Sequence, residues 1–421
     1  MINLEQASPG PDGRSRPLAL RAGPWIFATG LMAGKATNAA AALQESFPVP
    51  AQPSAQREAA LVFDLLETAL RKAGADLSRV VRLDQYYPTA SAVDPYHVER
   101  RKRFGAYIAP STSMLVRRLS APAASLEVQA IGVAGDAPFN VTPLDDPALR
   151  APATSGFAPA VIAGDLAFIP GLVASASPGT PARRGLAEAA RLPEGTLWKG
   201  TPIGLETRHL LEQRLAPSLK LAGASPGGVL KAQAYLTHAE DLGGFLQAWQ
   251  SFFGSDGPAL TVAPMPDPSI GVEDARLEIN FIALRDGAST SARRIAAPIT
   301  TAFAGVPAAV HAADLLFISG LYPLDSHGLV GTHPHDPAPV VQYQAAAIAT
   351  TARAICAAAG ADLSHLVRSQ LFLSDICDRS AVEQVWRDLG MPDVPTSCIE
   401  TANPMLFPGC RVMADLWVHA P

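Results

Sequence analysis

Three segments of this 421-residue chain repeat one pattern, and the repetition constrains the fold more than any other feature. Residues 70–90, 219–239 and 356–376 each leave an apolar helical segment, turn at Ala-Gly-Ala and continue as an apolar strand led by a basic residue. Glycine favours such a turn because it adopts left-handed backbone conformations at little cost. The turns lie about 140 residues apart, which is the size of a small domain rather than of a solenoid repeat.

Two further strand patterns surround each turn. An apolar strand ending in Gly-Leu precedes the helix, and a strand of alternating polarity follows the turn, which predicts a strand with two different faces. The first pattern lies at 25–33, 166–174 and 315–323, and the second at 125–133, 276–284 and 410–418. Each unit therefore combines strands with two helices, and the chain is predicted to be α+β.

Linkers rich in Pro, Gly, Ser and Asp divide the units, which we place at 1–140, 150–287 and 296–421. The second unit carries a long insertion at 174–204, which is either disordered or a functional lid. Pro217 interrupts the first helix of this unit, so we expect a kink or an early break there.

Composition excludes several classes of function. The net charge is −5 and the chain has no long Lys/Arg run, so we expect no nucleic-acid partner. No stretch approaches roughly 18 apolar residues, and the N-terminus lacks the apolar region of a secretory signal. The four cysteines form no C-x-x-C pair. We therefore expect a cytoplasmic protein with reduced thiols and no membrane contact.

A metal site receives little support from the sequence. His333 and His335 lie with Asp336 in a Pro-rich loop, a spacing that is common by chance. We expect no metal and no cofactor.

The order of these motifs resembles the RidA/YjgF family of small enamine and imine deaminases. The resemblance is carried by "ISG" (318–320), "AAGA" (358–361), "LVRSQLFLSD" (366–375), the "P-x-S" at 395–397 and the closing strand, and it recurs in the first unit and more weakly in the second. It implies three chorismate-mutase-type domains, each a mixed sheet with two helices. Members of the family are usually trimers, so the resemblance implies a single-chain pseudo-trimer around a central barrel, either monomeric or assembled into a higher homo-oligomer.

The resemblance also implies site residues, and here the sequence departs from the family. An arginine at the start of one strand clamps a substrate carboxylate in the family. Its position corresponds to Ser397 in the third unit, to Ser111 or Thr112 in the first and to Leu260 in the second, so no unit keeps it. A glutamate of the closing strand, which positions water, corresponds to Gln129, Asn280 and Asp415.

Other family positions keep polar groups in part. A serine corresponds to Thr29 and Ser319, and an asparagine corresponds to Cys377 in the third unit. The units are therefore no longer equivalent, and the third unit is the best candidate to supply catalytic groups.

Substitutes for the lost arginine could come from the first unit. Arg100 and Arg103 share one face of a predicted helix with Tyr96, so they either meet a ligand or extend to solvent. Tyr86 is expected in the sheet core, with a phenol that could also reach the site.

The sequence therefore predicts a cofactor-independent hydrolase or deaminase acting on a small polar metabolite with an enamine, imine or related C–N bond. Asp415 would activate water, and Ser319, Ser397 or Cys398 would polarise the substrate. Cys398 and Glu400 share one strand face, although an attacking thiol needs a depressed pKa.

Two alternatives stay open. The lost arginines are compatible with a binding or sensing module that does no chemistry, and relatives of this architecture can act on cyclic metabolites such as chorismate, because a fold does not fix chemistry.

Overall fold

The computed structural model describes residues 1–6, 16–35, 53–150, 155–176, 182–183, 185–196, 199–331, 339–402 and 405–421. These residues form an α+β structure with mixed sheets, so this part of the predicted fold class is confirmed. No helix among them is long and apolar enough to cross a membrane. The histidines at 333 and 335 lie outside the described residues, as does much of the insertion around residue 180.

Three large sheets share one strand order, counted from the edge inward. The first sheet orders its strands β1-β2-β3-β7-β4-β5, the second β8-β9-β10-β15-β13-β14, and the third β16-β17-β18-β23-β21-β22. In each sheet one neighbouring pair is parallel (β4–β5, β13–β14, β21–β22) and the other pairs are antiparallel. The same chain path is therefore followed three times.

The bounds of the elements follow the three patterns read from the sequence. The first sheet and its helices are β1 (Ile2–Gln6), β2 (Pro17–Ala22), β3 (Trp25–Leu31), α2 (Ser54–Lys72), β4 (Val80–Tyr87), α3 (Val93–Phe104), β5 (Ser111–Leu115) and β7 (Glu127–Val133). The second set is β8 (Val141–Leu144), β9 (Ala160–Ala163), β10 (Leu166–Leu172), α4 (Pro202–His209), α5 (Ala216–Leu221), β13 (Ala224–Leu236), α6 (Leu242–Phe253), β14 (Ala259–Pro264) and β15 (Leu277–Arg285).

The third set is β16 (Arg293–Ile295), β17 (Ala309–Ala312), β18 (Leu315–Ile318), α7 (Val340–Ala359), β21 (Leu366–Leu373), α8 (Arg379–Asp388), β22 (Thr396–Glu400) and β23 (Val412–His419). A strand from the first part of the chain, β6 (Arg118–Leu119), extends this sheet by pairing with β22. Two small ribbons complete the structure: β11 (Ala182–Arg183) with β12 (Leu186–Ala187), and β19 (Leu324–Asp325) with β20 (Gly328–Leu329). The ladders of the described residues thus form separate open sheets and do not close into one barrel.

Pro217 does not break its helix. A π-helical turn at Leu210–Leu215 joins α4 to α5, and Pro217 lies in the first turn of α5. A π-helical turn frees backbone groups locally, which accommodates a residue without an N–H. The expected break is therefore replaced by a local widening of a continuous helix.

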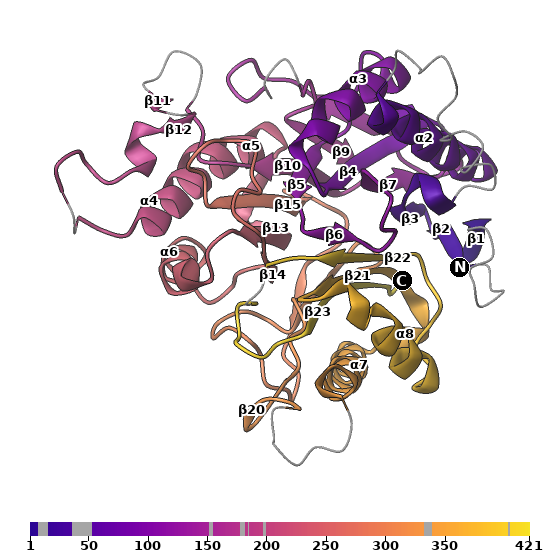
Figure 1. Ribbon diagram of the computed structural model, residues 1–421. Helices are drawn as coiled ribbons and strands as arrows, with labels where there is room; N and C mark the ends of the chain where they lie inside the picture. Colours follow the sequence, from indigo (N-terminus) through magenta and orange to yellow (C-terminus); the bar gives the residue numbers. More distant parts are fainter. Residues whose placement is uncertain are drawn as a thin grey trace.

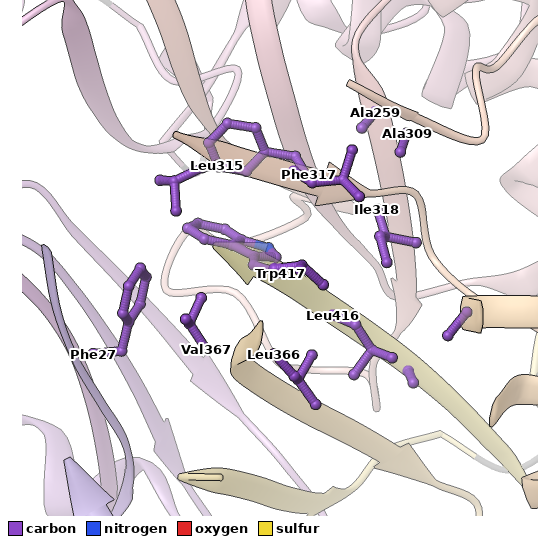
Figure 2. Close-up of a cluster of buried hydrophobic side chains, with 14 of the residues drawn as sticks. Phe27, Ala259, Ala309, Leu315, Phe317, Ile318, Leu366, Val367, Leu416 and Trp417 are labelled. Carbon is purple, nitrogen blue, oxygen red and sulfur yellow. The ribbon is translucent and has the colours of Figure 1, made fainter. Parts of the chain in front are cut away.

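Helices lie at the periphery and the sheets face one another at the centre (Figure 1). Apolar side chains fill the space between each sheet and its helices, and further apolar clusters join the sheets. In one of them Trp417 lies between Phe27 and Phe317 (Figure 2), with ring centroids 6.4 Å and 4.9 Å apart in edge-on geometry. Phe27 belongs to the first sheet, so this aromatic contact fixes the first sheet against the third.

Buried polar side chains fill the centre, where the helix-free faces of the three sheets meet. We call this set the central polar cluster; it comprises Arg82, Asp84, Tyr86, Gln129, Lys231, Gln233, Tyr235, Arg368, Gln370 and Asp415. Hydrogen bonds cross between sheets from Arg82 to Gln233 (2.8 Å), from Gln233 to Gln370 (2.8 Å) and from Gln370 to Tyr86 (2.7 Å). Buried polar groups are tolerated where such bonds replace water, so the cluster specifies how the three sheets fit together.

Candidate active site

A hydroxyl side chain of each large sheet contacts a neighbouring sheet, and we call these three places of contact junctions. Thr112, Thr261 and Ser397 hold the same register, opposite Asp84, Gln233 and Gln370 on the neighbouring parallel strand. Each contacts the closing strand of another sheet. Thr112 accepts a hydrogen bond from Asn280 (3.0 Å), Thr261 donates to Asp415, and Ser397 donates to Glu127. The contacts run from the first sheet to the second, from the second to the third and from the third to the first.

The register also refines two positions read from the sequence. In the first sheet the residue equivalent to Ser397 is Thr112 rather than Ser111, and in the second it is Thr261 rather than Leu260. Ser111 instead accepts a hydrogen bond from Arg100 (2.8 Å) and donates one to Gln85 (2.9 Å).

The three residues expected to catalyse together lie at two different junctions. Ser319 accepts a hydrogen bond from the Leu260 amide (3.1 Å), which places it with Asp415 between the second and third sheets. Cys398 follows Ser397 on β22, which contacts the first sheet through Ser397, and its side chain lies on the opposite face of that strand. Asp415 and Cys398 therefore do not share one site.

Asp415 belongs to the central polar cluster. Its side chain is fully buried and forms ion pairs with Lys231 (3.2 Å) and Arg368 (3.7 Å). Burial alone would raise the pKa of Asp415, but the charges of Lys231 and Arg368 outweigh this and lower it. A carboxylate held in this way is a weak base, so its evident role is to neutralise two buried cations.

The junction of the first and third sheets holds a denser set of reactive groups. Ser397 of β22 donates a hydrogen bond to Oε1 of Glu127 on β7, and both side chains are fully buried. Strand β3, which carries Thr29, packs against β22. A buried hydroxyl–carboxylate pair thus joins two sheets at this junction.

Arg379 brings a positive charge to this junction. It is the first residue of α8, it donates to Oε1 of Glu383 (2.7 Å), and its side chain is 30% exposed. Burial lowers the pKa of Arg379, but the charges of Cys398, Glu383 and Glu127 outweigh this and raise it. Glu383 also binds Arg16 (2.8 Å), so two arginines share this carboxylate.

Comparison with known families identifies part of the chain. Residues 297–411 match the model of the family described as Endoribonuclease L-PSP. Through these residues the chain is similar to this family. The resemblance read from the sequence is therefore confirmed for the third part of the chain. No curated protein matches.

Solved structures resemble the chain as follows. A Rid-family protein of unknown function from Yersinia pestis is 20% identical, with a TM-score of 0.27, over 31% of this chain and all of its own. A member of the YjgF family from Neisseria meningitidis is 19% identical, with a TM-score of 0.25, over 35% and 98%. A chorismatase is 11% identical, with a TM-score of 0.48, over 81% of this chain and 93% of its own.

Other residues expected in the site have partners of their own. Glu400 accepts from Arg118 (2.6 Å) and from the Ile376 amide (2.9 Å) rather than from Cys398. Cys377 is exposed, and its amide binds Asp375. Both polar groups therefore stabilise the loop before α8.

The first-unit candidates are likewise held by protein groups. Arg100 is fully buried and donates to Ser111 and to the Ser155 carbonyl (2.6 Å). Arg103 pairs with Glu99 (3.0 Å), Glu67 and Asp64. Tyr86 lies in the central polar cluster, hydrogen-bonded to Tyr235 (2.7 Å), and Gln129 there accepts from Arg368 (2.8 Å).

Glu127 lies two residues before Gln129, the position that the resemblance assigns to the family glutamate, and was not singled out from the sequence. The strand register pairs Glu127, Glu278 and Met413 with Tyr86, Tyr235 and Phe372. The three residues assigned to the family glutamate lie two positions further along the same face. The glutamates in "SLEVQAIGV" and "RLEINFIAL" were the available signal.

Glu278 gives the junction of the first and second sheets a different character. It is buried, it accepts a hydrogen bond from the Ser113 amide, and burial raises its pKa to about 8. A carboxyl group in this state is protonated near neutral pH and can donate a proton.

Proposed function

We propose that this chain is a cofactor-independent enzyme that hydrolyses the C–N bond of a small, anionic imine or enamine at the junction of the first and third sheets. The observation that carries the proposal is the Ser397–Glu127 hydrogen bond across that junction, with the positive charge of Arg379 close to Glu127. The similarity of residues 297–411 to the family supports a small-molecule function of this kind.

Arg379 would bind the carboxylate of the substrate. A guanidinium presents paired donors that match a carboxylate, and Arg379 is open enough to receive one. This replaces the arginine that the sequence lacks at the start of β22. The site then takes its cation from the first turn of α8.

Glu127 would act as the general base. It would take a proton from water as the water oxygen attacks the imine carbon, and would return it to the nitrogen as the carbinolamine forms. A second proton would then pass from the carbinolamine hydroxyl to the nitrogen as the C–N bond breaks, so that imine and water give a carbonyl compound and ammonia. Ser397 holds Glu127 in position. We assign this role to Glu127 rather than to Asp415, because Asp415 is engaged with two cations.

We also propose that the chain is a pseudo-trimer of three related units, 1–140, 150–287 and 296–421. The shared strand order supports this, as do the cyclic contacts of Thr112, Thr261 and Ser397. In such an arrangement every site contains residues of two units, and the three sites can diverge independently.

A binding module that does no chemistry is the second candidate. The full burial of both Ser397 and Glu127 favours it, because water must reach Glu127 for hydrolysis. Turnover separates the two functions, whereas binding alone does not.

The test uses the purified full chain and 2-imino acids generated in the cuvette, with release of ammonia as the readout. We expect turnover by the wild type and a loss of roughly a hundredfold or more in kcat for Glu127→Gln, which keeps the hydrogen bond from Ser397 but cannot accept a proton. The exposed Asp256→Asn serves as control. Turnover by Glu127→Gln at the wild-type rate, or ligand binding without any turnover by the wild type, would overturn the proposed chemistry.

A further inference from the structure

A cavity of about 670 Å³ lies in the second part of the chain, away from the junction described above. Its walls come from the segment around Leu186–Leu192, from the start of α4 and from the loop at 267–276. None of Glu127, Ser397, Cys398 and Arg379 lines it. This cavity has no role in the proposed hydrolysis.

Glu206 of α4 lines this cavity. Side chains at equivalent places in the other two parts of the chain make the same kind of hydrogen bond to the backbone. Each of the three first helices sends one side chain to backbone amides just before the closing strand. Glu58 accepts from the Ser125 amide (2.7 Å), Glu206 from the amides of Arg276 and Leu277 (3.0 and 3.1 Å), and Gln344 from the Arg411 amide (2.7 Å).

Glu206 differs from Glu58 and Gln344 in the contacts of its second polar atom. Glu58 uses its other oxygen for the Ser125 hydroxyl (2.6 Å), and the Gln344 amide nitrogen donates to Val330 and Gly409. Both bonds to Glu206 go to Oε1, and among the described residues none is made to Oε2. Glu206 is 1% exposed and lines the cavity, so we take Oε2 to be the oxygen that a ligand there can reach.

Carboxylates outnumber guanidinium groups in the lining of this cavity. Carboxylates of Glu206, Asp267, Glu273 and Asp274 line it, and the two guanidinium groups in its wall already have partners. Arg191 pairs with Asp274 (3.1 Å), and Arg276 pairs with Asp241 (2.9 Å). His238 lies 3.7 Å from the exposed Asp267 at the same wall. An anionic ligand would be repelled by the Glu206 carboxylate here, whereas a cation would be attracted by it.

Apolar side chains supply the remaining wall. Leu186, Leu192, Ile270 and Val272 line the cavity, with Pro202 and Pro268. Sites for small organic ligands combine an apolar wall with a few polar groups that fix orientation. A ligand with an apolar body and one ammonium group matches both parts.

We propose that this cavity binds a small primary amine, whose ammonium group is received by Oε2 of Glu206 and whose apolar body packs against Leu186, Ile270 and Val272. Oε1 continues to hold the backbone amides before β15, so occupancy is coupled to the start of the closing strand. Burial raises the pKa of Glu206 to about 7 despite the two amide bonds, and a bound cation would favour its ionised form.

The test compares three probes with one body and different charge: 2-phenylethylammonium, 2-phenylethanol and 3-phenylpropionate. Binding is measured by calorimetry on the full chain at pH 7.5. We expect saturable binding of the amine, weaker binding of the alcohol and none of the carboxylate. Since a charge-assisted hydrogen bond contributes roughly ten- to a hundredfold in affinity, Glu206→Gln should weaken amine binding by at least about tenfold.

Glutamine already performs the same backbone tether at position 344, so Glu206→Gln is expected to fold. The matched control is Glu58→Gln, which alters the equivalent tether outside the cavity and should leave amine binding unchanged. The exposed Asp267→Asn offers a second variant at the cavity wall and should weaken binding severalfold.

Three results would overturn the proposal: no saturable binding of the amine, equal or tighter binding of the carboxylate, or unchanged amine affinity in Glu206→Gln. Turnover of imino acids is measured in parallel. Glu206→Gln should leave it unchanged, whereas Glu127→Gln should abolish it without affecting amine binding, so failure of either proposal is recognised separately.

Discussion

The ammonium of Lys231 lies 3.2 Å from the carboxylate of Asp415, although the two residues come from different sheets and both side chains are fully buried. Lys231 also donates to the Thr261 hydroxyl (2.8 Å) and to the Ile318 carbonyl (2.6 Å). One lysine of the second sheet therefore satisfies groups of the second and third sheets at once. Its pKa is lowered to about 8 by burial, partly countered by Asp415.

Asp415→Asn should destabilise the chain strongly. The substitution leaves Lys231 and Arg368 buried without their shared counter-charge, and breaking a buried pair in this way costs about 3–5 kcal/mol. The free energy of unfolding is measured by urea denaturation at pH 7. An unchanged midpoint would show that the carboxylate does not neutralise the cations.

The double variant Asp415→Asn/Lys231→Met is the matched control for this experiment. Removing both charges should recover part of the lost stability, because no unpaired ammonium then stays buried at this position. If the double variant is as unstable as the sum of the single ones, the two residues do not act as a pair.

Much of the fold could be read from the sequence because its signals are local. The apolar strands at 25–33 and 166–174 and the closing strands became β3, β10, β7, β15 and β23, and each Ala-Gly-Ala turn lies where a helix gives way to a strand. Polar–apolar alternation and turn glycines are signals that extend over only a few residues, so they can be recognised without knowing which strands pair.

The site could be read only in part, because its members meet across sheets. Ser397 and Cys398 were found from the order of motifs, but Arg379 has no such motif and gains its importance from lying near Glu127 and Cys398. The sequence also did not indicate that Asp415 and Cys398 are separated. Both belong to the third sheet, but Asp415 contacts the second sheet, whereas the strand of Cys398 contacts the first. Contacts of this kind depend on the packing of the sheets, which local patterns do not encode.

Glu278 should make stability fall as the pH rises. Its pKa is about 8 in the folded chain, because of burial, against an ordinary value of 4.5. The folded state therefore holds a proton that the unfolded state releases, so the stabilising contribution is complete below about pH 4.5 and is lost as the pH rises through 8. Thermal unfolding between pH 5 and 8.5 should show this loss, and Glu278→Gln should reduce it.

Asp256→Asn, at an exposed position, is the control and should leave the pH dependence of the wild type intact. An equal fall of Tm with pH in Glu278→Gln and in the wild type would mean that Glu278 titrates normally in the folded chain.

Gly171 should tolerate no side chain. A Cβ there would lie 2.0 Å from Oε1 of Glu278 and 2.9 Å from its Cδ, and the buried carboxyl has little room to move. Gly171→Ala should lower the free energy of unfolding by about 1–3 kcal/mol, the usual cost of overpacking. Gly243→Ala, in α6 with open space around it, should be neutral or stabilising, because alanine favours helices.

Combining Gly171→Ala with Glu278→Ala tests the cause of the loss. The shortened side chain removes the clash, so the alanine at position 171 should cost less in this background than in the wild type. Equal costs in the two backgrounds would locate the strain elsewhere.

Arg379→Lys should separate charge from geometry in substrate binding. Lysine keeps the positive charge but loses the paired donors, so KM for an anionic imine should rise by about tenfold, and Arg379→Gln, which loses both, should raise it by roughly a hundredfold. An uncharged imine of similar size should bind all three proteins alike. Arg387→Lys controls for changes in α8 itself, because among the described residues the Arg387 side chain is hydrogen-bonded only to Gln384. Because Arg379 lies at the half-exposed entrance rather than beside the reacting bond, kcat should change less than KM. An equal loss of affinity for the charged and the uncharged imine would show that Arg379 supports the structure of the junction without binding the carboxylate.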